Sequence, residues 1–110
     1  MAYLEEYNKI VTDGGYTITL PERIRQYVVL GDHLVVRVAS KEGDAEFNDK
    51  SGGVFCYDSY GKLLWSWIDQ NIFDIRVKNN TLLFYNPNGL GYQYEIDVKT
   101  GGKKKINIVK

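Results

Sequence analysis

Two reactive side chains occur once each in this sequence: His33 is its only histidine and Cys56 its only cysteine. A triad of the Ser-His-Asp or Cys-His kind would have to use His33, which follows a Gly-Asp dipeptide and is expected to flank a turn at the surface. Catalysis would need His33 in a cleft beside a carboxylate such as Asp58 or Asp97. Cys56 lies in the apolar run VFCYD without a basic neighbour, as is typical of an inert core cysteine. One histidine and one cysteine cannot form a usual zinc centre. The sequence therefore predicts a protein that is not an enzyme and that uses no cofactor.

Acidic side chains recur at short intervals in the segment that follows Ser40. They are Glu42, Asp44, Glu46 and Asp49, with Asn48 among them. Carboxylates at alternate positions can converge on a hard cation such as Ca²⁺. The helix-loop-helix calcium motif requires Gly at its sixth position and Glu at its twelfth. Counted from Asp44, those positions hold Asp49 and Phe55. We therefore expect a solvated acidic loop and no metal site.

Aromatic residues make up 14% of the chain, and Tyr and Trp are favoured where a surface binds as well as packs. Tyr60, in the turn DSYGK, and Phe47, in the acidic segment, have no obvious strand face to bury them. An exposed aromatic ring beside carboxylates suits a protein partner with a basic patch; the alternative is a ring folded back over the sheet. The residues expected to contact such a partner are Glu42, Asp44, Glu46, Phe47, Asp49 and Tyr60.

The charge balance argues against nucleic acid and anionic membranes as partners. Fourteen basic residues offset fourteen acidic ones, so no net field draws the chain to a polyanion. No GxxxxGK[ST] or GxGxxG run is present to bind phosphate. Lys103, Lys104 and Lys105 form the one basic cluster. On a terminal strand, such a cluster more often guards a sheet edge than contacts phosphate.

The first residues, MAYLEEYNKIV, lack the basic start and apolar run of a secretory signal. No stretch approaches the roughly 20 apolar residues that a membrane span needs. A single cysteine cannot form a disulfide within the chain, which favours a reducing compartment. These features predict a cytoplasmic protein.

The chain is expected to begin with a short helix over residues 2–11, because Tyr3, Leu4, Tyr7, Ile10 and Val11 recur at helical spacing. A Gly-Gly pair at 14–15 would end it. After it, the sequence changes to short runs rich in Val, Ile and aromatic residues, separated by turn dipeptides, as in a β protein.

Two dipeptides predict tight hairpins. Gly31-Asp32 separates IRQYVVL from HLVVRVA, and Asn79-Asn80 separates FDIRVK from TLLFYN. Residues 92–98, YQYEIDV, alternate in the manner of a strand with one buried face. In LLWSWI, the tryptophans share one face and Leu64 and Ile68 the other, so this strand is expected to be covered on both sides.

Residues 24–37 align without a gap on residues 72–85, and the two hairpin turns coincide. The segments that follow also correspond, with Asp58 matching Asp97 at the start of a Gly-containing turn. The chain is therefore predicted to form a single domain over residues 1–110, with repeat units at about 24–68 and 72–109. The units differ most in the loop at 40–53, which is longer in the first.

The segment VFCYDSYGKLLWSW resembles the repeats of β-propellers of the pyrroloquinoline-quinone type, and YEIDVKTGGKKKI is similar to the same element. The resemblance implies a four-stranded antiparallel meander in each unit and carries no active-site residues. The expected fold is thus all-β, with two four-stranded, propeller-blade-like units after a short N-terminal helix. A closed propeller usually needs at least four blades. Either several chains assemble, or the strands form a small barrel or sandwich.

The function expected from these features is non-catalytic binding of another protein, as in an adaptor or an immunity or inhibitor module. Self-association into a homo-oligomer is also expected, because two blades leave sheet edges uncovered. The alternative is a small barrel that binds an apolar or aromatic ligand among the residues Tyr57, Trp65, Trp67, Tyr92 and Tyr94.

Overall fold

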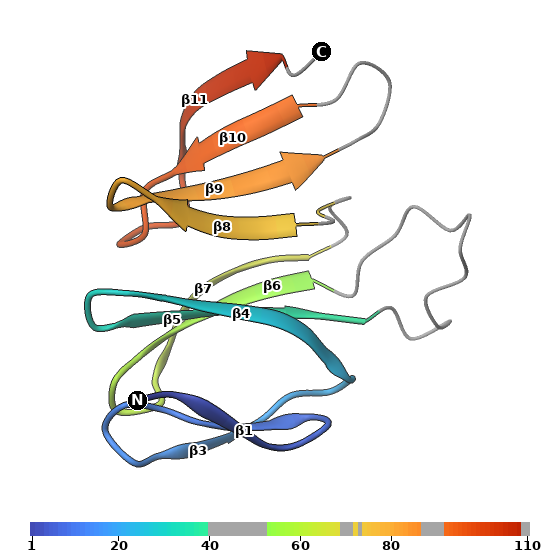
Figure 1. The fold of residues 1–110 in the computed structure, drawn as a ribbon, viewed down its shortest axis with the longest axis vertical. Helices are drawn as coiled ribbons and strands as arrows, with labels where there is room; N and C mark the ends of the chain where they lie inside the picture. The colour runs from blue at the N-terminus through green and yellow to red at the C-terminus, as the bar shows by residue number, and fades with distance from the viewer. Residues whose placement is uncertain (40–52, 69–71, 73, 87–91, 109–110) are drawn as a thin grey trace.

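Runs of β-branched and aromatic residues form every regular element that the structure describes. The computed structural model describes residues 1–39, 53–68, 72, 74–86 and 92–108. Within these ranges the chain forms eleven strands and no helix. The strands make three antiparallel sheets that are stacked in chain order, with the first sheet at the bottom of Figure 1 and the last at the top.

Each sheet is a meander in which neighbouring strands are consecutive in sequence. The first sheet contains β1 (Tyr3–Glu6), β2 (Lys9–Val11) and β3 (Thr17–Thr19). The middle sheet contains β4 (Ile24–Leu30), β5 (His33–Val38), β6 (Gly53–Asp58) and β7 (Leu63–Trp67). The last sheet contains β8 (Asp74–Lys78), β9 (Thr81–Asn86), β10 (Tyr92–Ile96) and β11 (Lys103–Ile108).

The predicted helix over residues 2–11 is wrong, because this segment forms the β1–β2 hairpin, with Leu4 opposite Ile10. The side chains of Tyr3, Leu4 and Tyr7 are exposed, so their helical spacing does not mark a buried face. Asn8 fixes the turn instead: its side-chain amide donates to the carbonyl oxygen of Leu20 at 3.2 Å, and its own carbonyl oxygen accepts from the Leu20 N–H at 2.8 Å. Asn is well suited to such a turn.

Both predicted hairpins are confirmed. Leu30 pairs with His33 around Gly31, whose φ is +62°. Lys78 pairs with Thr81 around Asn79 and Asn80, which have φ values of +51° and +61°. Positive φ at both central residues is the conformation that Asn tolerates and that matches the twist of the flanking strands.

The predicted pair of four-stranded units is also confirmed, and aligned residues face the same way in each. Phe55 and Tyr57 of the middle sheet pack toward the first sheet. Their counterparts in the last sheet, Tyr94 and Ile96, pack toward the middle sheet. The three-stranded first sheet was not predicted, since residues 2–11, which contain β1 and β2, were assigned to a helix.

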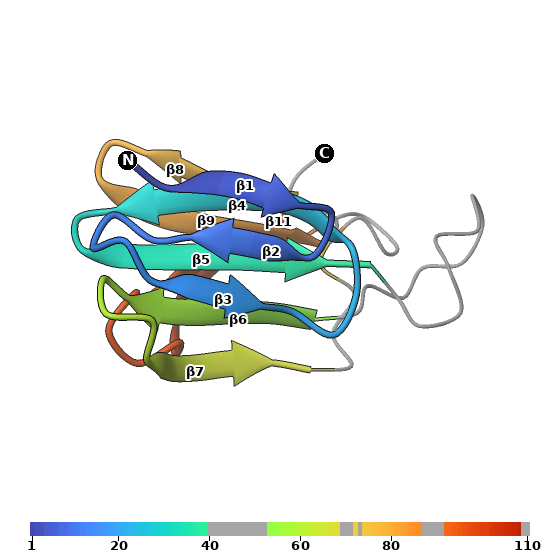
Figure 2. The same ribbon diagram turned by 90° about the horizontal axis from the view of Figure 1, so that it is seen from below.

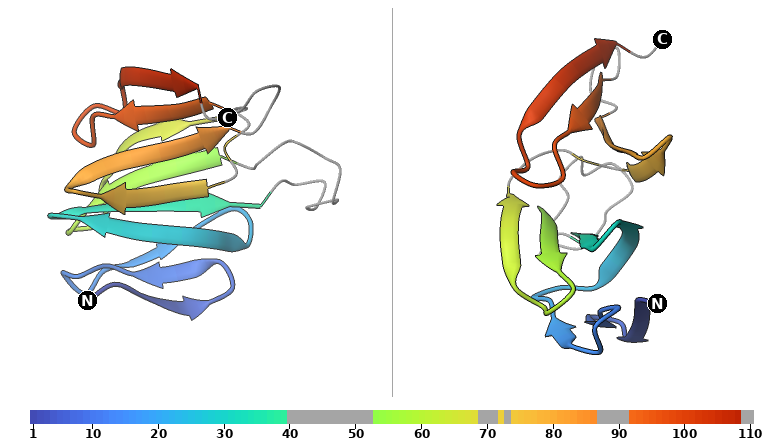
Figure 3. Two further views of the ribbon diagram at one scale, coloured as in Figure 1. Left: turned by 45° about the horizontal axis from the view of Figure 1, so that its top comes forward. Right: turned by 90° about the vertical axis from the view of Figure 1, so that its left-hand side faces the viewer.

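The three sheets are separate layers in the views of Figure 3, and an apolar core lies between each two neighbouring sheets. The lower core lies between the first and middle sheets and includes Ile10, Ile18 and Val36. The upper core lies between the middle and last sheets and includes Val35, Ile75 and Phe84. Because neighbouring residues of a strand point to opposite faces, Val35 and Val36 fill different cores. The middle sheet is therefore packed on both sides.

The first and last sheets lie at opposite ends of the stack (Figure 1). Among the described strands, neither the closed ring of a propeller nor a barrel is formed, and the chain is a stack of open sheets. No helix in the described ranges has the length and hydrophobicity of a membrane span.

Candidate functional site

Tyr60 is the one predicted contact residue that the structure describes. The other five, Glu42, Asp44, Glu46, Phe47 and Asp49, lie outside the described residues. Tyr60 lies in the turn between β6 and β7, and 73% of its surface is exposed. It is not folded back over the sheet.

A network of hydrogen bonds to Asp58 holds this turn in one conformation. The Asp58 carboxylate accepts from the backbone N–H groups of Tyr60 and Lys62, both at 2.9 Å. The backbone N–H of Asp58 donates to the carbonyl oxygen of Lys62 at 3.0 Å, and Gly61 has a φ of +82°. Asp97 makes the equivalent bond to the N–H of Lys99 at 2.9 Å. The two Asp-to-Gly turns predicted by the repeat thus share the bond from the aspartate carboxylate to the N–H two residues on, and the second turn is one residue longer.

The Tyr60 ring is paired with the Tyr16 ring, which precedes β3. Their centroids are 6.0 Å apart and the rings meet edge to face at 72°. Tyr16 is itself 49% exposed. The segment that carries Tyr16 is fixed to the middle sheet, because the Thr12 hydroxyl donates to the carbonyl oxygen of Ser59 at 2.7 Å. Two exposed rings from different sheets are therefore held together. We call Tyr16, Tyr60 and the adjacent exposed Leu63 the tyrosine surface.

The β7 strand is not covered on both sides, and the prediction that it would be is wrong. Trp65 and Trp67 pack into the upper core. On the opposite face, Leu64 is 37% exposed and Ile68 57% exposed, and Ser66 is exposed between them. The first sheet has only three strands, and in Figure 2 β7 lies beyond the edge of β3. We call Leu64, Ser66 and Ile68 the uncovered face of β7.

Sequence reasoning placed Leu64 and Ile68 on one face correctly, but it gave no sign that this face lacks a covering strand. The signal was present in the first residues. A hairpin followed by one strand supplies three strands, one fewer than the four of the middle sheet. The helical spacing of residues 2–11 masks this difference in strand number.

The tryptophans of β7 are fully engaged on their own side. The indole N–H of Trp65 donates to the carbonyl oxygen of Val98, and that of Trp67 to Gly101, both at 2.7 Å. The Trp67 ring lies 5.1 Å from the Phe84 ring and 5.9 Å from the Tyr94 ring. The five aromatic residues proposed to hold a ligand do not come together, because Tyr57 packs in the lower core while Trp65, Trp67 and Tyr94 pack in the upper one.

His33 lies among three carboxylates but not in a cleft. Its Nδ1 is 3.0 Å from the Asp32 carboxylate, and its strand neighbour across the sheet is Asp58. A pocket of about 10 Å³ is lined by His33, Asp13 and Asp58 among others. That volume holds about one water molecule. The Asp58 carboxylate is occupied by the turn, so this cluster has no room for a substrate.

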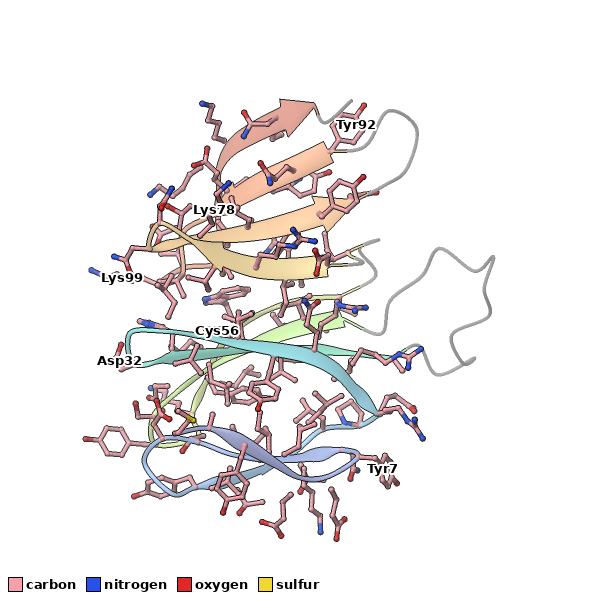
Figure 4. The ribbon with its side chains drawn as sticks, viewed as in Figure 1. Tyr7, Asp32, Cys56, Lys78, Tyr92 and Lys99 are labelled. Atoms are coloured by element: carbon pink, nitrogen blue, oxygen red, sulfur yellow. The ribbon has the colours of Figure 1, made fainter. Side chains whose placement is uncertain are left out.

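Cys56 and Tyr57 are buried neighbours on β6. Burial, reinforced by the negative charge of Asp58, raises the pKa of the Cys56 thiol to about 12. Burial and the nearby Cys56 raise the pKa of Tyr57 to about 12 as well. Figure 4 places Cys56 inside the stack, away from Asp32 and Lys99 at the exposed turns. A thiol that stays protonated is a poor nucleophile, which agrees with the inert core cysteine that was predicted.

The lysine cluster lies on the outermost strand of the last sheet, as expected of residues that guard an edge. The Lys103 ammonium lies 4.7 Å from the centroid of the Tyr94 ring and 5.4 Å from that of Trp67. Lys103 also lines, with Ser66, Trp67 and Ile68, a shallow hollow of about 320 Å³ at the end of β7. In the described ranges, no group of three His, Cys, Asp or Glu side chains is placed to hold a metal ion.

Comparison with known proteins gives no match: no family model, no curated protein and no solved structure is significantly similar to the chain. The resemblance to pyrroloquinoline-quinone-type repeats therefore stays a prediction.

Proposed function

We propose that this chain is a non-catalytic binding protein that recognises another protein through the tyrosine surface. The observation that carries the proposal is the exposed edge-to-face pair of Tyr60 and Tyr16 on a hydrogen-bonded turn. Tyrosine gives a large contact area for little loss of side-chain entropy, and a ring that is already fixed loses less still.

The surroundings of the pair favour a protein partner. Leu63 and the uncovered face of β7 continue the apolar surface along the middle sheet. An apolar surface that is continuous and rimmed by polar residues is typical of an interaction site. The acidic residues at 42–49 would add contacts to a basic partner. An adaptor or an immunity or inhibitor module acting in the cytoplasm would combine these properties.

The two other functions have less support. A barrel that binds an apolar ligand needs an internal cavity, whereas Trp65, Trp67 and Phe84 fill the space between the middle and last sheets with rings 5–6 Å apart. An enzyme needs a substrate beside His33, where the pocket measures about 10 Å³.

Site-specific photocrosslinking tests the proposed function. A photoreactive phenylalanine would replace Tyr60 in the full chain, and the protein would be irradiated in the cells that produce it. We expect one or a few discrete adducts of higher mass. The matched control places the same residue at Lys78, which is exposed on β8 at a distance from the tyrosine surface. No adduct at position 60, or the same adducts from both positions, would contradict the proposal.

A further inference from the structure

We propose that the outer edge of β3 accepts one extended strand from a partner protein, which lies over the uncovered face of β7. The strand would be apolar at alternate positions and acidic at its two ends. This inference rests on the proposed function and specifies how the partner is bound.

The backbone of β3 presents unpaired groups on its outer side. The Thr12 N–H donates to the Tyr16 carbonyl oxygen, and the Leu20 N–H to that of Asn8, both at 2.8 Å. Since hydrogen-bonded pairs alternate along an antiparallel ladder, Ile18 also bonds to β2, while Thr17 and Thr19 point their N–H and C=O groups away from it. Within the described ranges these outward groups have no partner. They form the pattern that an added strand needs.

The surface beside this edge is the uncovered face of β7, which belongs to the adjacent middle sheet. β4, β5 and β6 contribute side chains to the lower core, but β7 contributes none. A fourth strand beside β3 would lie over Leu64, Ser66 and Ile68 and would remove their apolar groups from water. Side chains at alternate positions of that strand would face β7, which is why its apolar residues should recur at every second position.

The charges on the sheet edges single out this one. The outer strands β1, β4, β8 and β11 carry charged side chains, including Glu5, Arg25, Lys78 and the lysines of β11. Such charges protect an edge from pairing. The sequences of β3, TIT, and of β7, LLWSW, carry none. The two unguarded strands are neighbours in the stack.

Charge complementarity and shape define the occupant. Lys62 precedes β7 at one end of the uncovered face, and Lys103 lines the hollow beside Ile68 at the other. Acidic residues at both ends of a bound strand would face these lysines. Because β7 extends beyond β3 (Figure 2), the space suits an isolated strand. A second copy of the chain that paired along β3 would bring its own middle sheet against β7. The space therefore suits a single strand better than a second copy.

The test uses the full chain and a fluorescein-labelled peptide, Glu-Val-Thr-Val-Thr-Val-Glu, with fluorescence anisotropy as the readout. We expect saturable binding that is at least about 10-fold tighter than that of the same peptide with lysine at both ends. Thr19→Pro removes one outward N–H without touching the β2–β3 ladder, and Ile68→Lys places a charge on the uncovered face of β7. Each should weaken binding about 10-fold or more.

Leu4→Lys is the matched control, because Leu4 is an exposed apolar residue on the opposite edge of the same sheet. It should bind the peptide as the unchanged chain does. Absence of saturable binding up to about 1 mM peptide would overturn the inference. So would binding that Ile68→Lys leaves unchanged in a folded variant.

Sedimentation of the same samples distinguishes self-association of the chain from binding of a partner strand. A dimer that Ile68→Lys dissociates would assign the edge to self-association and overturn the proposed occupant. Discrete photocrosslinks at position 60 together with no peptide binding would leave the proposed function standing and remove only strand addition.

Discussion

The two faces of the middle sheet differ in how completely they are covered. The upper face meets four strands, and β7 contributes Trp65 and Trp67 to the core there. The lower face meets three strands, and the corresponding face of β7 stays in water. The same strand is therefore a structural element on one side and an open surface on the other. One missing strand converts core positions into a candidate binding site.

More hydrogen bonds cross the upper interface than the lower one. At the upper interface, Gln26 of β4 donates to the Asp74 carboxylate at 2.7 Å and to the Ile75 carbonyl oxygen at 2.8 Å, and it accepts from the Ile75 N–H at 2.9 Å. At the opposite edge of the middle sheet, the indole N–H groups of Trp65 and Trp67 donate hydrogen bonds across the same interface. Among the described residues, one side-chain bond, from Thr12 to Ser59, and one backbone bond, from the Ile24 N–H to the Tyr7 carbonyl oxygen at 2.7 Å, link the first and middle sheets. The first sheet should be the less firmly held of the two outer sheets.

The largest predicted effect comes from Phe84→Ala. Phe84 is fully buried and contacts both tryptophans, so its loss leaves a cavity in the upper core. We expect a decrease of about 3–5 kcal/mol in the free energy of unfolding, measured by urea denaturation. Tyr60→Ala is the matched aromatic control and should cost less than about 1 kcal/mol, because Tyr60 is exposed. Equal losses would remove the distinction between core and surface rings.

Gly101→Ala should be the next most damaging. Gly101 has a φ of +76°, and a Cβ there would lie 2.6 Å from the Trp65 ring. Backbone strain and crowding together should cost roughly 2–4 kcal/mol. Gly31→Ala isolates the strain, because Gly31 also has positive φ but an added Cβ would meet nothing within 4 Å. It should cost only about 1–2 kcal/mol. If the two variants are equally stable, the turn does not pack against Trp65 as described.

Alkaline pH should destabilise both cores, because deprotonation of Cys56 and of the adjacent Tyr57 is opposed in the folded chain. The pKa of Cys56 is raised from 9.0 to about 12 and that of Tyr57 from 10.0 to about 12, so the unfolded chain loses these protons first. Stability is therefore kept below pH 9 and falls as the pH rises toward 12, by up to about 1.4 kcal/mol per pH unit for each group.

Denaturation at a series of pH values checks this assignment. Cys56→Ala should move the onset of the fall from near pH 9 to near pH 10, the ordinary pKa of the remaining tyrosine. Tyr57→Phe should leave the onset near pH 9 and make the fall shallower. Cys56 faces the upper core and Tyr57 the lower one. An onset that Cys56→Ala leaves at pH 9 would contradict the burial of Cys56, and a fall that Tyr57→Phe leaves equally steep would contradict the burial of Tyr57.

The smallest predicted effect is that of Ile68→Ser on the uncovered face of β7. Because Ile68 is largely in water, its free energy of unfolding should change by no more than about 0.5 kcal/mol. The same change at Ile75, which is fully buried, should cost more than about 3 kcal/mol. A large loss at Ile68 would mean that its side chain is covered in solution.

Much of the fold could be predicted from the sequence, because turn chemistry and repetition are local signals. Gly31 and the Asn79-Asn80 pair marked hairpins that the structure contains, and the gapless alignment of 24–37 with 72–85 identified the two four-stranded units. The first hairpin could not be recognised. Its apolar residues fall at helical spacing by coincidence, and its turn depends on the contact between Asn8 and Leu20.

The candidate site was predicted only in part. Exposure of Tyr60 followed from its place in a turn with no strand face to bury it. Its pairing with Tyr16 depends on how the first sheet meets the middle one, and no local pattern encodes that contact. The uncovered face of β7 depends on the number of strands in a neighbouring sheet. Alternation identifies which residues share a face, but it does not identify what lies opposite.

Amide hydrogen exchange by NMR on the free protein tests the open edge of β3 most directly. The N–H groups of Thr17 and Thr19 should exchange at nearly the rate of an unstructured chain, because they point away from β2. The N–H of Ile18, bonded within the sheet, should be protected by at least about 10-fold. Equal protection of all three amides would show that the edge is already paired, and it would contradict both the open face of the middle sheet and the strand-addition site.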